Sequence, residues 1–280
     1  MKTISSLADW DDDEKHCAAA IDGAARTVVI RDNLDAILSR FEVYRIYRAS
    51  AEKIPASVFA ATSWKNDFIA LYKRPPKGMK ELKQRLRNLE LEYCSYCGGD
   101  NPPSQLDHIL EKAKFPEFSL LSLNLVHVCV TCNNSKTDPF RNGVRCFLNP
   151  YVDTFMDHID VTCCIRIVKG WPSFEILLSG NISAADRDIA IRHLDTFKIS
   201  TRFPDWARRK FKRLSKSYSL EIAGGLDAKA WVEKRGNDHA NDHHRNSWVA
   251  VLCRGIAASD EALELFATYT IVSEMRKADQ

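Results

Sequence analysis

The sequence has no long apolar run, no strong excess of one charge and no internal repeat. None of its 280 residues lies in a segment approaching the roughly 20 apolar residues that span a membrane. The formal net charge is only +3, so a nucleic-acid surface would have to come from local basic clusters. The first residues lack the apolar core of a secretory signal and turn acidic at residues 11–14. We therefore expect a chain without membrane contact or signal peptide.

Four of the nine cysteines form two Cys-x-x-Cys pairs, Cys94/Cys97 and Cys129/Cys132. Two such knuckles supply the four thiolates of a tetrahedral zinc site. No ligand position is left open, so the predicted zinc is structural. The alternatives are two unrelated pairs or a redox motif, but a redox motif needs only one pair. Nine cysteines, four of them assigned to zinc, indicate reduced thiols and a cytoplasmic location.

The segment between the two pairs predicts its own small structure. Apolar residues flank Asp107-His108 within residues 105–110, which favours a short buried strand. Residues 122–128 alternate in apolar character and predict a second strand. Residues 132–136 should open a helix that an asparagine or serine caps. The expected order is strand, strand and helix around one metal.

This stretch resembles the HNH endonuclease family (the ββα-metal or His-Me finger fold) in its four-cysteine form. The family pattern is carried by Leu-Asp-His at 106–108, Asn-Leu-Val at 124–126 and Cys-Asn-Asn-Ser-Lys at 132–136. Two positions depart from it. Asn133 stands where many members have histidine, and Glu111 stands where proline is common.

The resemblance implies a hydrolytic site. His108 would activate water, and its imidazole has an ordinary pKa suited to a base at neutral pH. Asp107 and Asn133 would hold a catalytic divalent ion, with Mg²⁺ expected and Mn²⁺ as the alternative. Asn124 would orient the base, and Lys136 would lie near the scissile phosphate. The hypothesis requires a solvent-accessible His108 ring within one water of the oxygens at 107 and 133.

Each of these residues also has a structural interpretation. His108 could be a core histidine bonded by Asn124, and Asp107 could be a turn carboxylate. Asn133 could be a helix cap, in which case Asn134 takes the third motif position. Lys136 could be a solvated helix charge.

The remaining chain predicts a mostly helical α+β protein. We expect helices over residues 1–90, the nuclease module over 91–140, and a C-terminal region over 141–280. The last begins with strands at 161–168 and 173–178 that turn near residues 170–172. Ser183 caps a predicted helix through Phe197, residues 236–246 read as a loop, and helices close the chain from 248 to 271.

Two basic segments are candidate nucleic-acid contacts. The helix expected near 204–218 places its basic residues around an apolar stripe, and residues 77–87 form a second amphipathic helix. Such charges neutralise phosphates without reading sequence. Both could instead be solvated helix faces. The candidates are Arg208, Arg209, Lys210, Lys212, Arg213, Lys216, Lys80 and Lys83.

The sequence thus predicts a metal-dependent endonuclease that cuts nucleic acid, with DNA favoured. An RNA endonuclease, acting for example on tRNA, is the alternative of the same chemistry. A non-catalytic zinc module that binds nucleic acid or protein is the alternative of another class. The chain is also similar to HNH effectors of bacterial anti-phage systems, Septu-type and retron-associated, which implies an ATPase partner.

Overall fold

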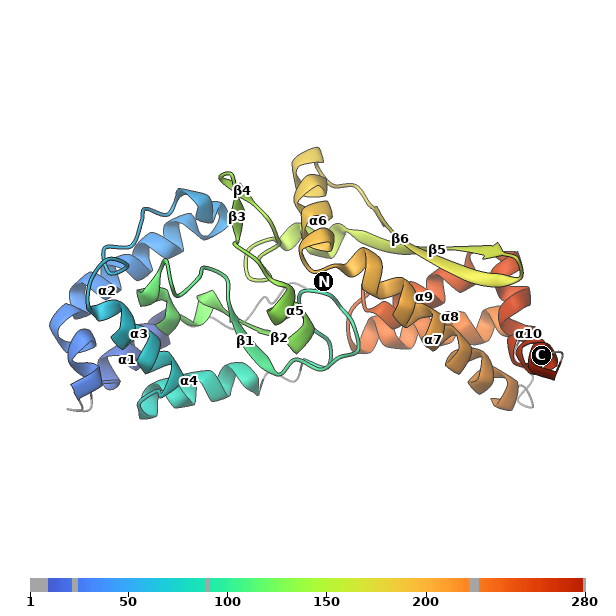
Figure 1. Ribbon diagram of the computed structural model, residues 1–280, viewed down its shortest axis with the longest axis horizontal. Helices are drawn as coiled ribbons and strands as arrows, with labels where there is room; N and C mark the ends of the chain where they lie inside the picture. The colour runs from blue at the N-terminus through green and yellow to red at the C-terminus, as the bar shows by residue number, and fades with distance from the viewer. Residues whose placement is uncertain (1–9, 22–24, 89–90, 222–226, 279–280) are drawn as a thin grey trace. The chain divides into compact units, whose positions relative to one another are not determined.

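The computed structural model describes residues 10–21, 25–88, 91–221 and 227–278. They confirm a mostly helical fold with small two-stranded sheets (Figure 1). The chain forms two compact units. Of the residues that the structure describes, those within 10–96 and 102–154 form the N-terminal unit, and those within 97–101 and 155–278 form the C-terminal unit. The expected boundaries at 90 and 140 follow sequence pattern and stay predictions.

The N-terminal unit begins with helices packed on one apolar core. The apolar positions of the second helix recur at helical spacing, and Ile37, Phe41 and Tyr44 are all buried. The Tyr44 ring meets Phe118 edge-on at 5.1 Å between centroids, which ties the helix to the loop after the first motif. The four helices are α1 (Trp10–Ala19), α2 (Val28–Tyr47), α3 (Trp64–Lys73) and α4 (Lys77–Arg87).

The ββα arrangement lies in this unit. Strand β1 (Gln105–His108) pairs antiparallel with β2 (Leu125–Val128), with His108 opposite Leu125. Both strands are shorter than expected, because residues 122–124 form a turn of 3₁₀ helix before β2. The Asn124 side chain there binds the Leu110 backbone, which would otherwise need a strand partner.

Helix α5 (Val130–Ser135) starts before the position predicted for it. The prediction of an asparagine or serine cap is wrong, because the Cys129 sulfur accepts the N–H of Cys132 at 3.4 Å. A thiolate at a helix N-terminus satisfies an orphan N–H and is favoured by the helix dipole. Lys136 follows the last helical residue.

A second hairpin joins β3 (Phe140–Arg141) to β4 (Val144–Arg145) and was not expected. Its turn is Asn142-Gly143, with φ of 53° and 75°. Positive φ at both central residues defines the turn type that Asn-Gly favours.

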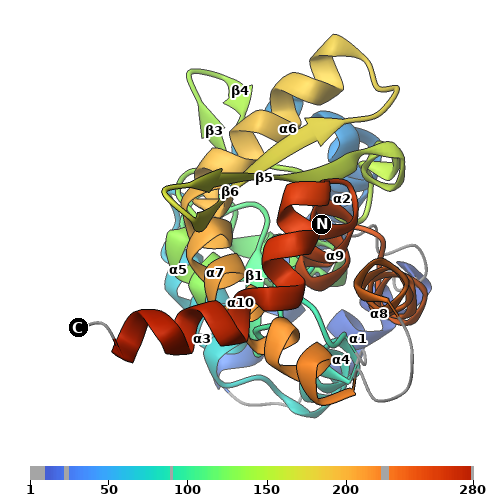
Figure 2. The same ribbon diagram turned by 90° about the vertical axis from the view of Figure 1, so that its right-hand side faces the viewer.

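The C-terminal unit is built on a long hairpin, β5 (Asp160–Val168) and β6 (Trp171–Ser179). The turn is Lys169-Gly170, with φ of 53° and 75°, and not residues 170–172. Pro172 lies inside β6 opposite Ile167. Alternate residues of both strands are buried because helices cover one face of the hairpin, as Figure 2 shows.

Five helices complete this unit. Ser183 caps the first as predicted, its hydroxyl accepting the Asp186 N–H at 3.1 Å. In the described ranges no helix is both long and apolar enough to cross a membrane. The helices are α6 (Ala184–Thr196), α7 (Ile199–Glu221), α8 (Ala228–Asp242), α9 (Trp248–Ala257) and α10 (Asp260–Ala278).

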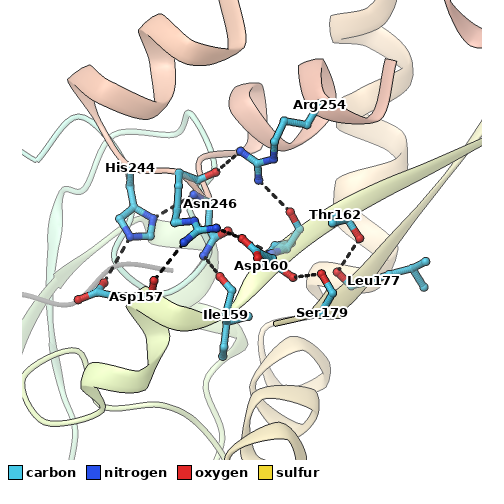
Figure 3. A network of polar contacts seen from close by, with 11 residues as sticks. Asp157, Ile159, Asp160, Thr162, Leu177, Ser179, His244, Asn246 and Arg254 are labelled. Atoms are coloured by element: carbon cyan, nitrogen blue, oxygen red, sulfur yellow. Dashed lines mark hydrogen bonds and ion pairs between the residues drawn. The ribbon is translucent and has the colours of Figure 1, made fainter. Parts of the chain in front are cut away.

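The loop predicted over residues 236–246 is mostly helix, because α8 continues to Asp242. Gly236 belongs to a close helix contact, since a Cβ there would lie 2.8 Å from the Cys253 Cβ of α9. The residues after α8 hold the start of β5 (Figure 3). Asn246 donates to Ile159 O at 2.8 Å and accepts from Val161 N at 3.1 Å. Asn246 therefore has a structural role.

Candidate metal-dependent nuclease site

The four paired cysteines converge. The sulfurs of Cys94, Cys97, Cys129 and Cys132 are buried and all lie within 4.8 Å of one another. A tetrahedral ion with Zn–S bonds of about 2.3 Å requires sulfurs separated by roughly 3.8 Å. Backbone N–H groups point at the sulfurs, including Cys129 N to Cys94 Sγ at 3.3 Å. This donor set fits structural zinc.

His108 ends β1 and is buried. Its side chain is 6% exposed, and the ring meets Tyr72 of α3 edge-on at 4.3 Å between centroids. The Tyr72 hydroxyl donates to Leu106 O at 3.1 Å, which holds the tyrosine against β1. The expectation of a solvent-accessible ring is therefore wrong for this conformation, because α3 covers it.

Burial sets the protonation of His108. It is the main cause that holds the pKa of the imidazole well below its ordinary value, and Lys112, Lys136 and Lys83 add repulsion. The ring is neutral at pH 7, which is the form a general base requires. Its Nε2 is buried and has no hydrogen-bond partner within the described residues.

Asp107 precedes His108 and contacts different groups. Its Oδ2 accepts the Tyr96 hydroxyl at 3.0 Å, and Lys136 Nζ lies 2.9 Å from the same oxygen and 3.1 Å from Oδ1. Lys136 Nζ also donates to His108 O. The Lys136 side chain is 7% exposed, so it is not a solvated helix charge. It orients the Asp107 carboxylate.

Asn124 fixes the loop that follows His108. Its Oδ1 accepts Leu110 N at 2.7 Å, and its Nδ2 donates to Leu110 O at 3.1 Å and Phe118 O at 3.0 Å. Its backbone carbonyl accepts Ile109 N at 2.8 Å. The Asn124 side chain therefore acts through the backbone after the histidine, and these bonds do not make it a partner of the ring.

The oxygen donors suit a hard cation. An ionised carboxylate has about four acceptor positions, and the Asp107 contacts with Tyr96 and Lys136 use three of them. Asn133 is half-buried on α5 and offers an amide oxygen, whereas Asn134 is exposed. Carboxylate and amide oxygens are the hard donors that Mg²⁺ takes together with several waters, although Lys136 already pairs with this carboxylate.

The basic candidates fall into two groups. On α7 the apolar stripe is buried, and Arg209, Lys212, Arg213 and Lys216 are exposed. Carboxylates already engage the other two: Arg208 pairs with Asp205 at 3.1 Å, and Lys210 lies 3.9 Å from Asp100.

On α4 the two candidates differ. Lys80 is exposed, but Lys83 is only 8% exposed and donates to Tyr72 O at 2.8 Å. The expectation of Lys83 as a surface contact is wrong, because its stem lies on the apolar face of the helix.

The central motif matches a known family model. Residues 94–139 match the family model of the HNH endonuclease. The chain is also 30% identical over 117 residues to Protein ea31 of Escherichia phage lambda. That alignment covers 40% of each protein, so the chain spans about two fifths of this relative. No solved structure matches the chain significantly.

Three residues around the HNH motif were not found from the sequence. Tyr72, Tyr96 and Lys112 contact or surround Asp107 and His108. Tyr96 lies between the cysteines of the first knuckle, so its position was a usable signal. Tyr72 comes from a helix distant in sequence, and no local pattern marks it.

Proposed function

We propose that this protein is a metal-dependent HNH endonuclease that hydrolyses phosphodiester bonds in nucleic acid, with DNA as the favoured substrate. The observation that carries the proposal is the match of residues 94–139 to the HNH endonuclease, with Asp107 and His108 inside it. The neutral imidazole and the adjacent buried carboxylate support it chemically.

The roles follow from the contacts. Asp107 and Asn133 would hold Mg²⁺, which would supply a Lewis acid to the phosphate. His108 would accept a proton from the attacking water at an imidazole nitrogen once the Tyr72 ring that covers it has moved aside. Lys136 and Tyr96 hold the carboxylate in place, and Asn124 holds the segment after the base. The exposed cations of α7 and Lys80 would bind the sugar–phosphate backbone.

The decisive experiment uses supercoiled plasmid DNA and total RNA, each with Mg²⁺, Mn²⁺ or EDTA. Wild type should nick the plasmid with Mg²⁺ and not with EDTA, and His108→Ala should reduce cutting by at least about 100-fold. His127→Ala is the matched control, because His127 is equally buried on β2 and carries no proposed role. Equal cutting by wild type and His108→Ala would refute the assignment.

Burial of His108 favours one other candidate, a non-catalytic zinc module that binds nucleic acid or protein. It predicts no cutting of either substrate and binding that survives His108→Ala. Cutting of RNA alone would identify the third possibility, an RNA endonuclease.

We further infer a cytoplasmic role in anti-phage defence beside an ATPase, on the resemblance to such effectors. Co-expression of the protein with its ATPase partner should reduce the number of plaques that a phage forms, and His108→Ala should abolish that reduction.

A further inference from the structure

Two ammonium groups lie over the ring that covers His108. Lys83 Nζ is 3.9 Å from the Tyr72 ring centroid, and Lys112 Nζ is 5.5 Å from it. The same ring meets the His108 imidazole at 4.3 Å. Lys83 comes from α4 and Lys112 from the loop after β1, so separate segments bring two cations to the same tyrosine ring.

Positive charge exceeds negative charge here. Lys83 and Lys112 both lie over the Tyr72 ring, and the Asp107 carboxylate already pairs with Lys136 at 2.9 Å. Asp107 attracts Lys112, whereas Lys73 and Lys136 repel it. Burial and like charges lower the pKa of Lys83 to about 8, and they lower the pKa of Lys112 as well. An anion beside these lysines would offset that repulsion.

An unused polar atom indicates where such an anion would react. His108 Nε2 is buried and lacks a hydrogen-bond partner among the described residues, although an unpaired buried nitrogen destabilises a folded protein. A catalytic or ligand-binding role is one of the reasons for which a native protein keeps such a group. The two cations lie over the Tyr72 ring that covers His108, and the unpaired nitrogen belongs to His108 itself. These two observations are independent of each other.

We propose that Lys112 is a substrate-binding residue that holds the reacting phosphodiester beside His108. This assignment rests on the proposed function and extends it to a phosphate contact outside the HNH motif residues. Lys114, two residues further along, is the contrast, because it is exposed and pairs with Asp138 and Glu111.

The first test measures binding without cutting. A fluorescein-labelled DNA duplex is titrated with His108→Ala protein across a salt series. Each neutralised phosphate contributes about −0.9 to the slope of log K against log salt concentration. Adding Lys112→Met should reduce the magnitude of the slope by about 0.9, the contribution of one phosphate contact. Lys112→Arg in its place should restore the slope of the His108→Ala protein, and Lys114→Met should leave that slope unchanged.

The second test measures cutting with otherwise wild-type protein. Lys112→Met should lower kcat/KM by roughly 10-fold to 100-fold, the equivalent of one charge-assisted hydrogen bond. Lys112→Arg should recover most of the loss. Zinc content and thermal midpoint must match wild type, and Lys112→Gln replaces the methionine variant if they do not.

The outcomes separate the two proposals. An unchanged salt slope and unchanged kcat/KM for Lys112→Met overturn the phosphate contact while cutting by wild type stands. A wild type that never cuts, with a slope that still depends on Lys112, overturns the nuclease and retains the phosphate contact.

Discussion

Replacing Asn124 tests the loop behind the candidate base. The side chain is fully buried and makes three hydrogen bonds to the backbone of Leu110 and Phe118, at 2.7, 3.1 and 3.0 Å. Each such bond contributes about 1 kcal/mol net, and each backbone group left unpaired costs about 1–3 kcal/mol. Asn124→Ala should therefore destabilise the protein by roughly 3–5 kcal/mol. This is a large share of a typical stability of about 5–15 kcal/mol.

Asn124→Asp separates shape from hydrogen bonding. The carboxylate can still accept the Leu110 N–H, but it loses both donors and faces two buried carbonyl oxygens. We expect a loss at least as large as for alanine at pH 7. Urea unfolding followed by tryptophan fluorescence measures both variants, with zinc content recorded. The matched control is Asn134→Ala, an exposed asparagine whose loss should change stability by less than about 0.5 kcal/mol. A loss below about 1 kcal/mol for Asn124→Ala would refute the hydrogen-bond account.

Three further predictions follow. Tyr96→Phe removes the hydroxyl bonded to Asp107 at 3.0 Å, and should lower nuclease activity severalfold in a Mg²⁺ titration while zinc content is unchanged. Cys132→Ser should abolish stoichiometric zinc and collapse thermal stability, whereas Cys17→Ser, outside the cluster, should keep the zinc. Burial raises the pKa of Asp13 from 3.8 to about 6, so the folded chain holds a proton that the unfolded chain has lost. Stability should therefore fall by roughly 2 kcal/mol between pH 4 and pH 6 because of Asp13, and Asp13→Asn should flatten that part of the urea-unfolding profile.

Motif spacing predicted the centre of the fold well. The sequence spacing of the two cysteine pairs and of Asp107-His108 allows few arrangements in which four sulfurs meet. The order strand, strand, helix could therefore be predicted. The β5–β6 hairpin and the Ser183 cap were also visible, because both depend on local patterns. The Asn142-Gly143 turn had an equally local signal that was not used.

Tertiary contacts explain what the sequence could not predict. Gly236 is typical of a loop in the sequence, but in the structure it lies in α8 and contacts Cys253 of α9. Lys83 is typical of a surface cation in the sequence, but in the structure it donates a hydrogen bond to the Tyr72 backbone oxygen. The prediction that His108 is exposed was wrong for the same reason, because Tyr72, which covers it, comes from α3, far upstream in the sequence.

The contacts of Asp107 join the sulfur cluster to the hydrolytic site. Tyr96 is fully buried between Cys94 and Cys97, and its hydroxyl donates to the Asp107 carboxylate. The position of Tyr96 depends on the knuckle, because the two cysteines fix the backbone on both sides of it. Lys136 binds the same carboxylate just after α5, the helix that Cys129 caps. Both groups that orient Asp107 therefore come from segments that contain the four cysteines, so zinc bound there would help to fix the position of the Asp107 carboxylate.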